Sequence, residues 1–469
     1  SNRARHPEDP MIFTQYYLDC LSQASYLVGD GTTGQAIVVD PRRDVAEYLA
    51  DAQAQGLRIV GVVNTHFHAD FVSGHLELAR ATGAWIGYGA AAQPEFAVRR
   101  LADGERISLG EVTLQVMATP GHTPESISVL VFEHADDEVA YGVLTGDALF
   151  IGDVGRPDLL ASVGVTAEQL GAMLYDSVQH RLMTLPDAVR VFPAHGAGSA
   201  CGKNLSTERQ STIGEQRRLN YACQPMSEAE FVEVVTSGQP PAPAYFRYNA
   251  TLNKHARVVR ATDATVPALT DEQVDAALAA GAVLHDARDQ QEFAAGHLRG
   301  ALNVPWDGRL AETVGTVLTP EQQVVVMAPE GQAQQVATRF ARIGFDNVLG
   351  YVADPEAYLL AHQRDVTPAS RLTVGQAVDA LASPDTQLVD IRNAGELAAG
   401  MLPGARHIPL AQLVARAGEL DPTCPVLLYC AGGWRSSVGA SLLRAKGFAD
   451  VSDLLGGYGA WVLVEPATS

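Results

Sequence analysis

The chain has 469 residues, 47% of them hydrophobic, which predicts two to four domains with cores of ordinary size. Its formal net charge of −21 argues against nucleic acid or an anionic membrane as the main partner. No apolar run could span a bilayer, the N-terminus lacks the apolar region of a signal peptide, and five scattered cysteines form no disulfide framework, so we expect a cytoplasmic protein.

The first half of the chain, about residues 11–244, alternates short β-rich runs with polar turns. Strands are expected at 12–17, 25–28, 36–39, 57–63, 112–117, 127–132, 140–145 and 189–192. Helices are expected at 45–55, with Asp44 as N-cap, and at 74–82. His75, at the start of the second helix, is interpreted as a capping or surface histidine. Residues 224–265 are rich in Pro and Ala and are expected to form an extended arm, ending in a linker at 245–265.

Six polar residues fall at the ends of these strands or in the loops that follow them. They are His66, His68, Asp70, His122, Asp147 and His195. Loops at the edge of a rigid sheet are where functional sites are built. Buried imidazole and carboxylate groups must be paired or must coordinate something, so the pattern predicts a metal or catalytic site.

Four short motifs carry these residues: HxHxD at 66–70, GHT at 121–123, GD at 146–147 and PAHG at 193–196. Together they resemble the metallo-β-lactamase fold, an αββα sandwich with a metal site at one edge. The binuclear zinc hydrolases of that fold carry a further histidine where this chain has Phe71. A phenyl ring cannot coordinate a metal, so we expect a single metal ion.

Among the one-metal branches of that fold, this half most resembles the persulfide dioxygenases. The resemblance implies iron(II), one per chain, held by His66, His122 and Asp147. Two histidines and one carboxylate leave three positions open on an octahedral ion, which is typical of non-haem iron oxygenases. The spacing leaves His68 open as a fourth ligand, but we favour a supporting role, orienting the ligands or bonding to substrate, for His68, Asp70 and His195.

Two further residues near these motifs are candidates for binding substrate. Residues 150–158 resemble the persulfide dioxygenase stretch whose arginine binds the acidic thiol carrier, which implies that Arg156 binds a carboxylate of glutathione persulfide. The alternative for Arg156 is a loop ion pair with Asp153 or Asp158. Cys201 is a candidate persulfide carrier whose thiolate Lys203 would favour, or else a packed small side chain.

The second half contains an internal repeat: residues 285–305 and 389–409 are similar at an offset of 104. Each copy reads strand, Asp-x-Arg, acidic helix, Gly-Ala and apolar-Pro, which predicts a parallel α/β unit. Both units resemble rhodanese domains, the sulfurtransferase fold, and we place them at 266–364 and 370–466. The expected fold class is therefore α/β multidomain, a metallo-β-lactamase sandwich followed by two rhodanese-like parallel-sheet domains.

The second unit carries the nucleophile expected of a sulfurtransferase. A buried strand at 426–429 runs into Cys430, and a helix is expected to start near Ser437. Backbone N–H groups at a helix start favour an anion such as a thiolate or persulfide. The six-residue loop from Cys430 to Arg435 has the sulfurtransferase length of the family, whereas phosphatase relatives have a longer loop. The loop residues are Ala431, Gly432, Gly433 and Trp434, and Ser436 follows.

The first rhodanese-like unit lacks the sulfur-transfer chemistry. Ala328 or Met327 stands where the cysteine would be, and Glu330 places a negative charge in the anion-binding loop. We expect this unit to be inactive and to serve as a spacer or docking surface.

Three functions are compatible with these features. The first is a bifunctional enzyme of sulfide detoxification: it would oxidise glutathione persulfide or a similar persulfide with O2 to sulfite and thiol, and transfer sulfane sulfur among thiosulfate, persulfide and sulfite through Cys430. The second is a zinc-dependent thioester hydrolase of the glyoxalase type with accessory rhodanese modules, against which Phe71 argues. In the third, the rhodanese units only bind partners or sense sulfur. We also expect a homo-oligomer, dimer or tetramer.

Overall fold

The computed structural model of the protein describes residues 9–159 and 164–464. Its internal contacts divide the chain into two units, Ser1–Ala264 with Arg342–Gly344, and Thr265–Ala341 with Phe345–Ser469. Within the described residues, every helix is too short or too polar to cross a membrane.

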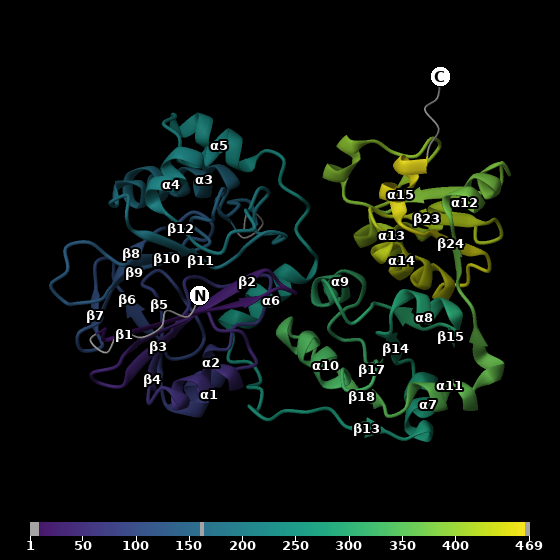
Figure 1. Ribbon diagram of the computed structural model, residues 1–469, viewed down its shortest axis with the longest axis horizontal. Helices are drawn as coiled ribbons and strands as arrows, with labels where there is room; N and C mark the ends of the chain where they lie inside the picture. Colours follow the sequence, from purple (N-terminus) through teal and green to yellow (C-terminus); the bar gives the residue numbers. More distant parts are fainter. Residues whose placement is uncertain (1–8, 160–163, 465–469) are drawn as a thin grey trace. The chain divides into compact units, whose positions relative to one another are not determined.

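The first unit contains two six-stranded sheets (Figure 1). The first sheet has the order β1 (Met11–Leu18), β2 (Gln23–Asp30), β3 (Gln35–Val39), β4 (Arg58–Val63), β5 (Trp85–Gly89) and β6 (Arg99–Leu101). The second has the order β12 (Ser211–Thr212), β11 (Arg190–Pro193), β10 (Gly142–Gly146), β9 (Ile127–Phe132), β8 (Thr113–Ala118) and β7 (Arg106–Ser108). The strands expected from the sequence are all present, with ends shifted by no more than three residues.

The two sheets bury one apolar core between them and carry helices on their outer faces. The shared core includes Val28, Val39, Val116, Val129 and Phe192. Helices α1 (Ala46–Ala54) and α2 (His75–Thr82) cover the first sheet. The second sheet is covered by α3 (Ala167–Tyr175), η2 (Asp176–Arg181), η3 (Leu182–Thr184), α4 (Ile213–Leu219), η4 (Tyr221–Cys223) and α5 (Glu228–Thr236). This is the expected αββα sandwich.

Two local expectations for this unit were wrong. The N-cap of α1 is Val45, without a side-chain cap, because the Asp44 carboxylate lies 3.2 Å from the Arg42 guanidinium instead. Residues 224–265 are not an extended arm throughout, since they contain α5 and α6 (Tyr245–Lys254). A Ser227–Glu230 capping box starts α5, and buried aromatic side chains on α6 overcome the Pro-rich composition before it.

The second unit contains two parallel five-stranded sheets with the same strand pattern (Figure 1). The first has the order β13 (Ala268–Leu269), β18 (Val348–Val352), β17 (Val324–Met327), β14 (Val283–Asp286) and β16 (Leu302–Asn303). The second has the order β20 (Ser370–Leu372), β24 (Val451–Leu454), β23 (Val426–Tyr429), β21 (Gln387–Asp390) and β22 (Arg406–His407). A short antiparallel pair, β15 (His297–Leu298) and β19 (Val366–Thr367), accompanies the first sheet.

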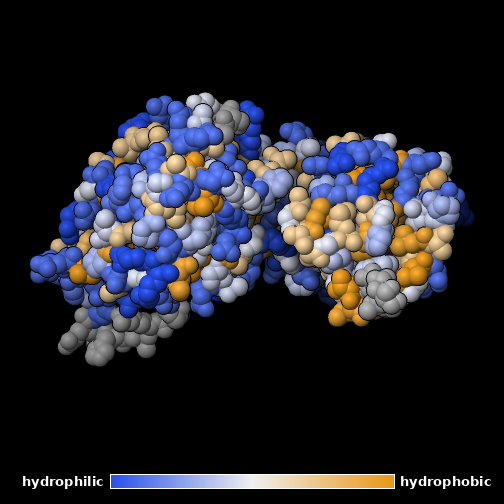
Figure 2. Space-filling view, turned by 90° about the horizontal axis from the view of Figure 1, so that it is seen from above, coloured by the Kyte–Doolittle hydropathy of each residue, from blue (hydrophilic) through white to orange (hydrophobic). Residues whose placement is uncertain are grey.

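Helices follow the strands of both repeats, as the βα pattern predicts. In the first repeat they are α7 (Asp271–Ala279), α8 (Gln290–Ala295), α9 (Leu310–Val317), α10 (Ala333–Arg342), α11 (Pro355–Ala361) and η5 (Gln363–Asp365). In the second they are α12 (Val374–Leu381), η6 (Ala394–Ala399), α13 (Leu410–Arg416), η7 (Ala417–Glu419), α14 (Trp434–Ala445) and α15 (Gly457–Val464). Polar and apolar side chains mix on the face of each unit seen in Figure 2, and the end of α15 exposes Val462, Leu463 and Val464.

Candidate functional site

The six predicted site residues are brought together at one edge of the sandwich, and all of them are buried. Strands β10 and β11 run parallel with Gly146 paired to Pro193, so Asp147 and His195 leave the sheet at the same edge. The HxHxD loop leaves β4 at the facing sheet. The structure thus joins residues that lie up to 129 positions apart in the sequence.

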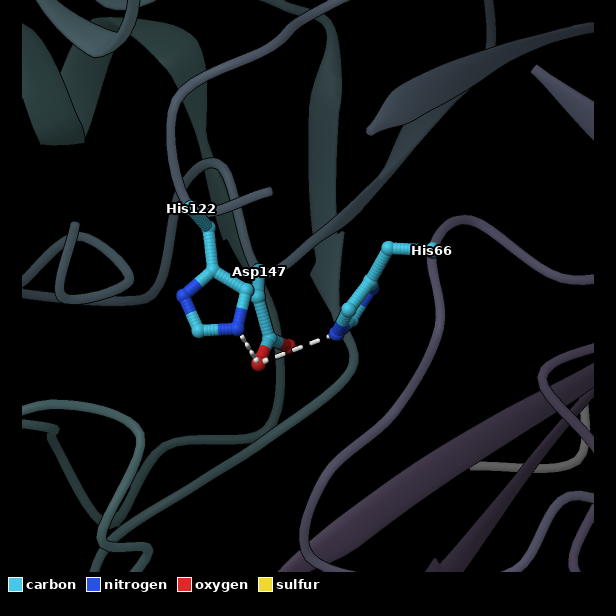
Figure 3. A group of neighbouring side chains, drawn as sticks. All are labelled: His66, His122 and Asp147. Carbon is cyan, nitrogen blue, oxygen red and sulfur yellow. Dashed lines mark ion pairs between the residues drawn. The ribbon is translucent and has the colours of Figure 1, made fainter. Parts of the chain in front are cut away.

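His66, His122 and Asp147 form the first group, whose ligand atoms lie close enough together to hold a metal ion (Figure 3). The Oδ2 atom of Asp147 lies 3.5 Å from Nε2 of His66 and 3.3 Å from Nε2 of His122. Within the described part of the chain, this oxygen has no hydrogen-bond partner. Two ring nitrogens and one carboxylate oxygen therefore converge on a common point.

The other ring nitrogen of each histidine is committed to a hydrogen bond. Asp40 accepts the Thr65 hydroxyl at 2.9 Å, so the Thr65 oxygen is left to accept Nδ1–H of His66 at 3.0 Å. Nδ1–H of His122 donates to the carbonyl oxygen of Arg156 at 2.8 Å. Both Nε2 atoms are consequently left with a lone pair aimed at the convergence point.

Two glycines permit these close approaches. A Cβ on Gly155 would lie 2.0 Å from the carbonyl oxygen of Asp147, so only glycine lets the chain pass there and bring the Arg156 carbonyl to His122. Gly146 has a φ of +53°, and a Cβ there would lie 2.6 Å from the Thr65 hydroxyl. The GD motif is therefore a backbone requirement as well as a source of the carboxylate.

His195 bridges two carboxylates. Its Nδ1 donates to Oδ1 of Asp147 at 2.7 Å and its Nε2 donates to Oδ2 of Asp70 at 2.6 Å. Burial opposes the charged ring, but the two carboxylates raise the pKa of His195 well above its usual value. Burial likewise opposes ionisation of Asp147, whose pKa is nevertheless held well below its usual value by His195 and His66. His195 therefore orients Asp147 as a cation.

The pKa values of His122 and His66 shift in opposite directions. Burial lowers the pKa of His122 to about 4, which keeps its Nε2 unprotonated at neutral pH. Burial opposes protonation of His66 as well, but Asp147 raises its pKa, so a proton competes with a cation for that nitrogen.

His68 belongs to a second group with Asp70 and His195 and lies outside the first. Its Nε2 donates to Asp40 at 2.8 Å, and its Nδ1 has no partner within the described residues. The ring of Phe71 lies 4.4 Å from the His68 ring, measured between centroids. An aromatic side chain thus borders this second group.

The HxHxD loop is supported by three side chains that the sequence did not indicate: Asp40, Glu125 and Asn253. Glu125 accepts the backbone N–H of Phe67 at 2.9 Å, and the amide of Asn253 donates to the carbonyl oxygens of His68 and Phe71. Asp40 follows a buried strand, as the predicted site residues do, so the same rule could have found it. Asn253 lies on α6 and carries no local signal.

The expectation for His75 was wrong. The side chain is fully buried rather than capping or at the surface, and neither ring nitrogen has a partner within residues 9–159 and 164–464. It packs against the Phe96 ring, with centroids 4.9 Å apart. Burial, together with Arg257, lowers its pKa well below the usual value, so it is a neutral core side chain.

Arg156 takes the arrangement that the sequence offered as the alternative, a loop ion pair with Asp158. Its Nε and Nη2 donate to the two Asp158 oxygens, each at 2.7 Å. Its Nη1 donates to the carbonyl oxygens of Ala200 and Pro240. The guanidinium is buried, so a carboxylate ligand would have to replace Asp158.

Cys201 is buried and its sulfur groups with Asp147 and His195. Lys203 does not favour its thiolate, contrary to expectation, because the ammonium group donates to the carbonyl oxygens of Val234 and Ser237. Burial and the carboxylates of Asp70 and Asp147 raise the pKa of Cys201 well above its usual value. The structure therefore holds Cys201 as a neutral thiol beside the first group.

The second candidate site is the loop after β23. Cys430 is buried, and its sulfur accepts the backbone N–H of Gly433 at 3.1 Å. Helix α14 begins at Trp434, three residues before the expected start, because Gly433 serves as N-cap with a φ of +95°. Ala431 and Gly432 are exposed at the loop tip, and Ser436 is buried and bonds to Asp453 at 2.8 Å.

The Arg435 guanidinium is occupied by an ion pair within its own domain. Its guanidinium makes a bidentate pair with Glu396 at 2.7 and 2.8 Å, and this bond raises the pKa of Arg435 further. In the first repeat, Ala328 follows β17 as Cys430 follows β23, so Ala328 occupies the cysteine position.

The first group fits a metal ion. Three acceptor atoms face each other without a good hydrogen bond between them, and such a buried cluster is costly unless a cation neutralises it. Non-haem iron(II) sites use this ligand set of two imidazole nitrogens and one carboxylate. In such sites each histidine ligand is also held by a hydrogen bond through its other ring nitrogen.

Comparison with family models gives two matches. The metallo-beta-lactamase superfamily model matches residues 18–195, and the rhodanese-like domain model matches residues 270–354 and 373–463. The six predicted site residues of the sandwich and the Cys430 loop lie within these matches.

Individual relatives agree with the family matches. The mitochondrial persulfide dioxygenase ETHE1 of Bos taurus is 30% identical over 249 residues, 52% of this chain and 88% of the relative. A hydroxyacylglutathione hydrolase of Hyphomonas neptunium is 32% identical over 172 residues, 36% of this chain and 60% of the relative. A crystal structure of a metallo-beta-lactamase from Staphylococcus aureus is 32% identical with a TM-score of 0.65, covering 73% of this chain and 98% of that one. The chain therefore belongs to the metallo-β-lactamase superfamily, has persulfide dioxygenase homologues, and carries two rhodanese-like domains in its C-terminal half.

Proposed function

We propose that the first unit, the metallo-β-lactamase-fold half of the chain, is a persulfide dioxygenase with one iron(II) per chain. It would convert a low-molecular-weight persulfide, O2 and water into the thiol and sulfite: RSSH + O2 + H2O gives RSH + H2SO3. The observation that carries the proposal is the convergence of His66 Nε2, His122 Nε2 and Asp147 Oδ2, with their other polar atoms committed elsewhere. Bound iron(II) would supply the redox chemistry between the persulfide sulfur and O2.

The chain's own residues hold and tune this site. Asp40 acts through Thr65 to fix the tautomer of His66, and the Arg156 carbonyl fixes that of His122. His195, held as a cation between Asp70 and Asp147, keeps one Asp147 oxygen occupied so that the other faces the convergence point. Preorganised ligands of this kind lose little free energy to reorganisation when the ion binds.

Arg156 is the candidate for binding the carboxylate of a carrier such as glutathione persulfide. A carboxylate would take the bidentate position that Asp158 holds in this structure. Cys201 is the candidate for carrying a persulfide close to Asp147, and its neutral, buried thiol would need to ionise first.

We further propose that Cys430 transfers sulfane sulfur. Its thiolate would attack the outer sulfur of thiosulfate, the sulfur–sulfur bond would break, and sulfite would leave with the bonding electron pair. The Gly433 N–H donates to the Cys430 sulfur, the atom on which the persulfide would form. The sulfur would then pass to a thiol, sulfite or cyanide.

The second candidate function is thioester hydrolysis with zinc. The group His68, Asp70 and His195 could hold a second ion, and a hydroxyacylglutathione hydrolase is among the relatives. Against it, the His195 ring is bonded to carboxylates through both nitrogens, and Phe71 borders the group.

Loading the protein with either metal separates the two functions. Protein reconstituted with iron(II) should take up O2 when glutathione persulfide is added, with one sulfite formed per O2. Protein reconstituted with zinc should not. Hydrolysis of S-lactoylglutathione by the zinc form, together with no O2 uptake by the iron form, would establish the hydrolase instead.

A further inference from the structure

Asn303 is a buried side chain at the end of β16, in the rhodanese-like repeat that lacks the cysteine. Its amide N–H groups donate to the carbonyl oxygens of Asp286 and Arg288, at 3.0 and 3.1 Å. Strand pairing with β14 places Asn303 beside Asp286. The side chain is therefore held firmly within its own domain, and its carbonyl oxygen is directed away from these bonds.

That oxygen and the backbone N–H of Asn303 both bond to helix α14 of the other repeat. The Ser437 hydroxyl donates to Oδ1 of Asn303 at 2.6 Å, and the Asn303 N–H donates to the Ser441 oxygen at 3.0 Å. The Ser441 hydroxyl in turn donates to the carbonyl oxygen of Val438 at 2.7 Å. Both serines are buried and stand one turn apart, so the two bonds clamp one face of α14.

The same helix supplies the N–H group that meets the Cys430 sulfur. Gly433, which caps α14, donates to that sulfur, and its own carbonyl oxygen accepts from Arg371 at 2.8 Å. Arg371 also pairs with Asp453 at 3.0 Å, and Asp453 accepts the Ser436 hydroxyl. The loop is therefore anchored from its own domain on one side, and its helix is anchored by the inactive domain on another.

The inactive domain also contacts the loop directly. The Trp434 indole nitrogen lies 3.5 Å from a carboxylate oxygen of Asp307. Gly308, with a φ of +65°, lies against the same indole, and a Cβ there would be 3.7 Å from the indole nitrogen. Trp434 is one of the six loop residues, so the segment after β16 borders the loop around Cys430.

We propose that the inactive rhodanese-like domain is a positioning element of the sulfur-transfer site, and that Asn303 is its key positioning residue. By clamping Ser437 and Ser441 it fixes the first turns of α14, and so the N–H group that donates to the sulfur of Cys430. This inference rests on the proposed sulfur transfer by Cys430. It assigns the domain without a nucleophile a role in the chemistry of its neighbour.

The test uses the full-length protein and two readouts. The first is kcat/KM for sulfur transfer from thiosulfate to cyanide, measured as thiocyanate. The second is the pH dependence of iodoacetamide alkylation of Cys430, followed by mass spectrometry of its peptide, which requires no sulfur transfer. The variants are Asn303→Ala, Ser437→Ala, the double variant and Ser437→Thr, which keeps the hydroxyl.

Each single alanine variant should lower kcat/KM roughly five- to tenfold, the size expected for one buried hydrogen bond. The double variant should be no worse than Asn303→Ala, because that variant already lacks the bond to Ser437. Alkylation should move to higher pH in each, and Ser437→Thr should restore both readouts. The matched control is Asn347→Ala, in the same domain, which loses amide bonds to the carbonyl oxygens of Pro320 and Glu321 and should behave as wild type.

Additive losses in the double variant, or wild-type kinetics and alkylation in Ser437→Ala, would overturn the inference. So would an equal loss in the Asn347→Ala control, which would indicate general destabilisation. A wild-type protein that transfers no sulfur would instead refute the proposed function, and the alkylation profile would still decide the positioning role. If Asn303→Ala fails to fold, the Ser437 pair carries the same test.

Discussion

The hydroxyl of Thr65 should control metal affinity although it cannot reach the metal position itself. Asp40 accepts the Thr65 O–H, which leaves the Thr65 oxygen to accept Nδ1–H of His66. Thr65→Val keeps the shape of the side chain and removes this oxygen. Nδ1–H would then be buried without a partner, and the ring would favour the tautomer that protonates Nε2, the liganding atom.

The magnitude follows from the cost of one buried unpaired donor, about 1–3 kcal/mol. Loss of an outer partner of a metal ligand weakens binding about 10- to 100-fold, or about 1.4–2.7 kcal/mol, which agrees with that cost. Thr65→Ser keeps the oxygen and should bind metal like the wild type. The assay is titration of metal-free protein with iron(II) under anaerobic conditions against a competing chelator, with circular dichroism as a check on folding. A folded Thr65→Val protein with wild-type affinity would refute this reasoning.

Three further predictions concern substrate binding, stability and the Cys430 loop. Arg156→Lys should raise the KM for glutathione persulfide about tenfold, because the bidentate guanidinium is lost. The iron content should not change, because the backbone carbonyl that accepts from His122 stays. An unchanged KM would show that Arg156 does not bind the substrate. Asp30 is buried, and although burial opposes its ionisation, hydrogen bonds hold its pKa below the usual value. The stabilisation from the ionised carboxylate is therefore present above about pH 4 and lost as pH falls. The difference in melting temperature between wild type and Asp30→Asn should shrink from pH 6 to pH 3, and a constant difference would contradict this. Glu396→Gln should lower sulfur transfer by no more than about fivefold, because its pair with Arg435 is partly exposed, and a larger loss in the cyanide assay would indicate a direct role.

The sequence predicted the positions of the site because chemistry and secondary structure coincide there. The six predicted residues lie at the ends of strands or in the loops that follow, and strand ends gather at one edge of a sheet, so a common site could be predicted without coordinates. The choice of His66, His122 and Asp147 among them came from the resemblance to the persulfide dioxygenases. Cys430 could be found in the same way, between a strand and a helix start. These are local patterns with a physical reason for their spacing.

The remaining features depend on contacts between distant segments. Asn253 and Asn303 gave no local signal, since each acts on a loop or helix more than 130 residues away. The burial of His75, the pairing of Arg156 with Asp158 and the neutral state of Cys201 depend on the shape of the surrounding core, which composition does not report. The prediction of a linker at residues 245–265 failed because α6 is stabilised by the burial of its side chains rather than by its helix propensity.

The most direct test of the central claim is the number of iron ions bound per chain after anaerobic reconstitution and removal of loosely bound metal. The account predicts one ion in the wild type and none retained by Asp147→Asn, because that change removes the carboxylate charge to which both histidines point. Two ions per chain in the wild type, or one ion retained by Asp147→Asn with wild-type affinity, would contradict it.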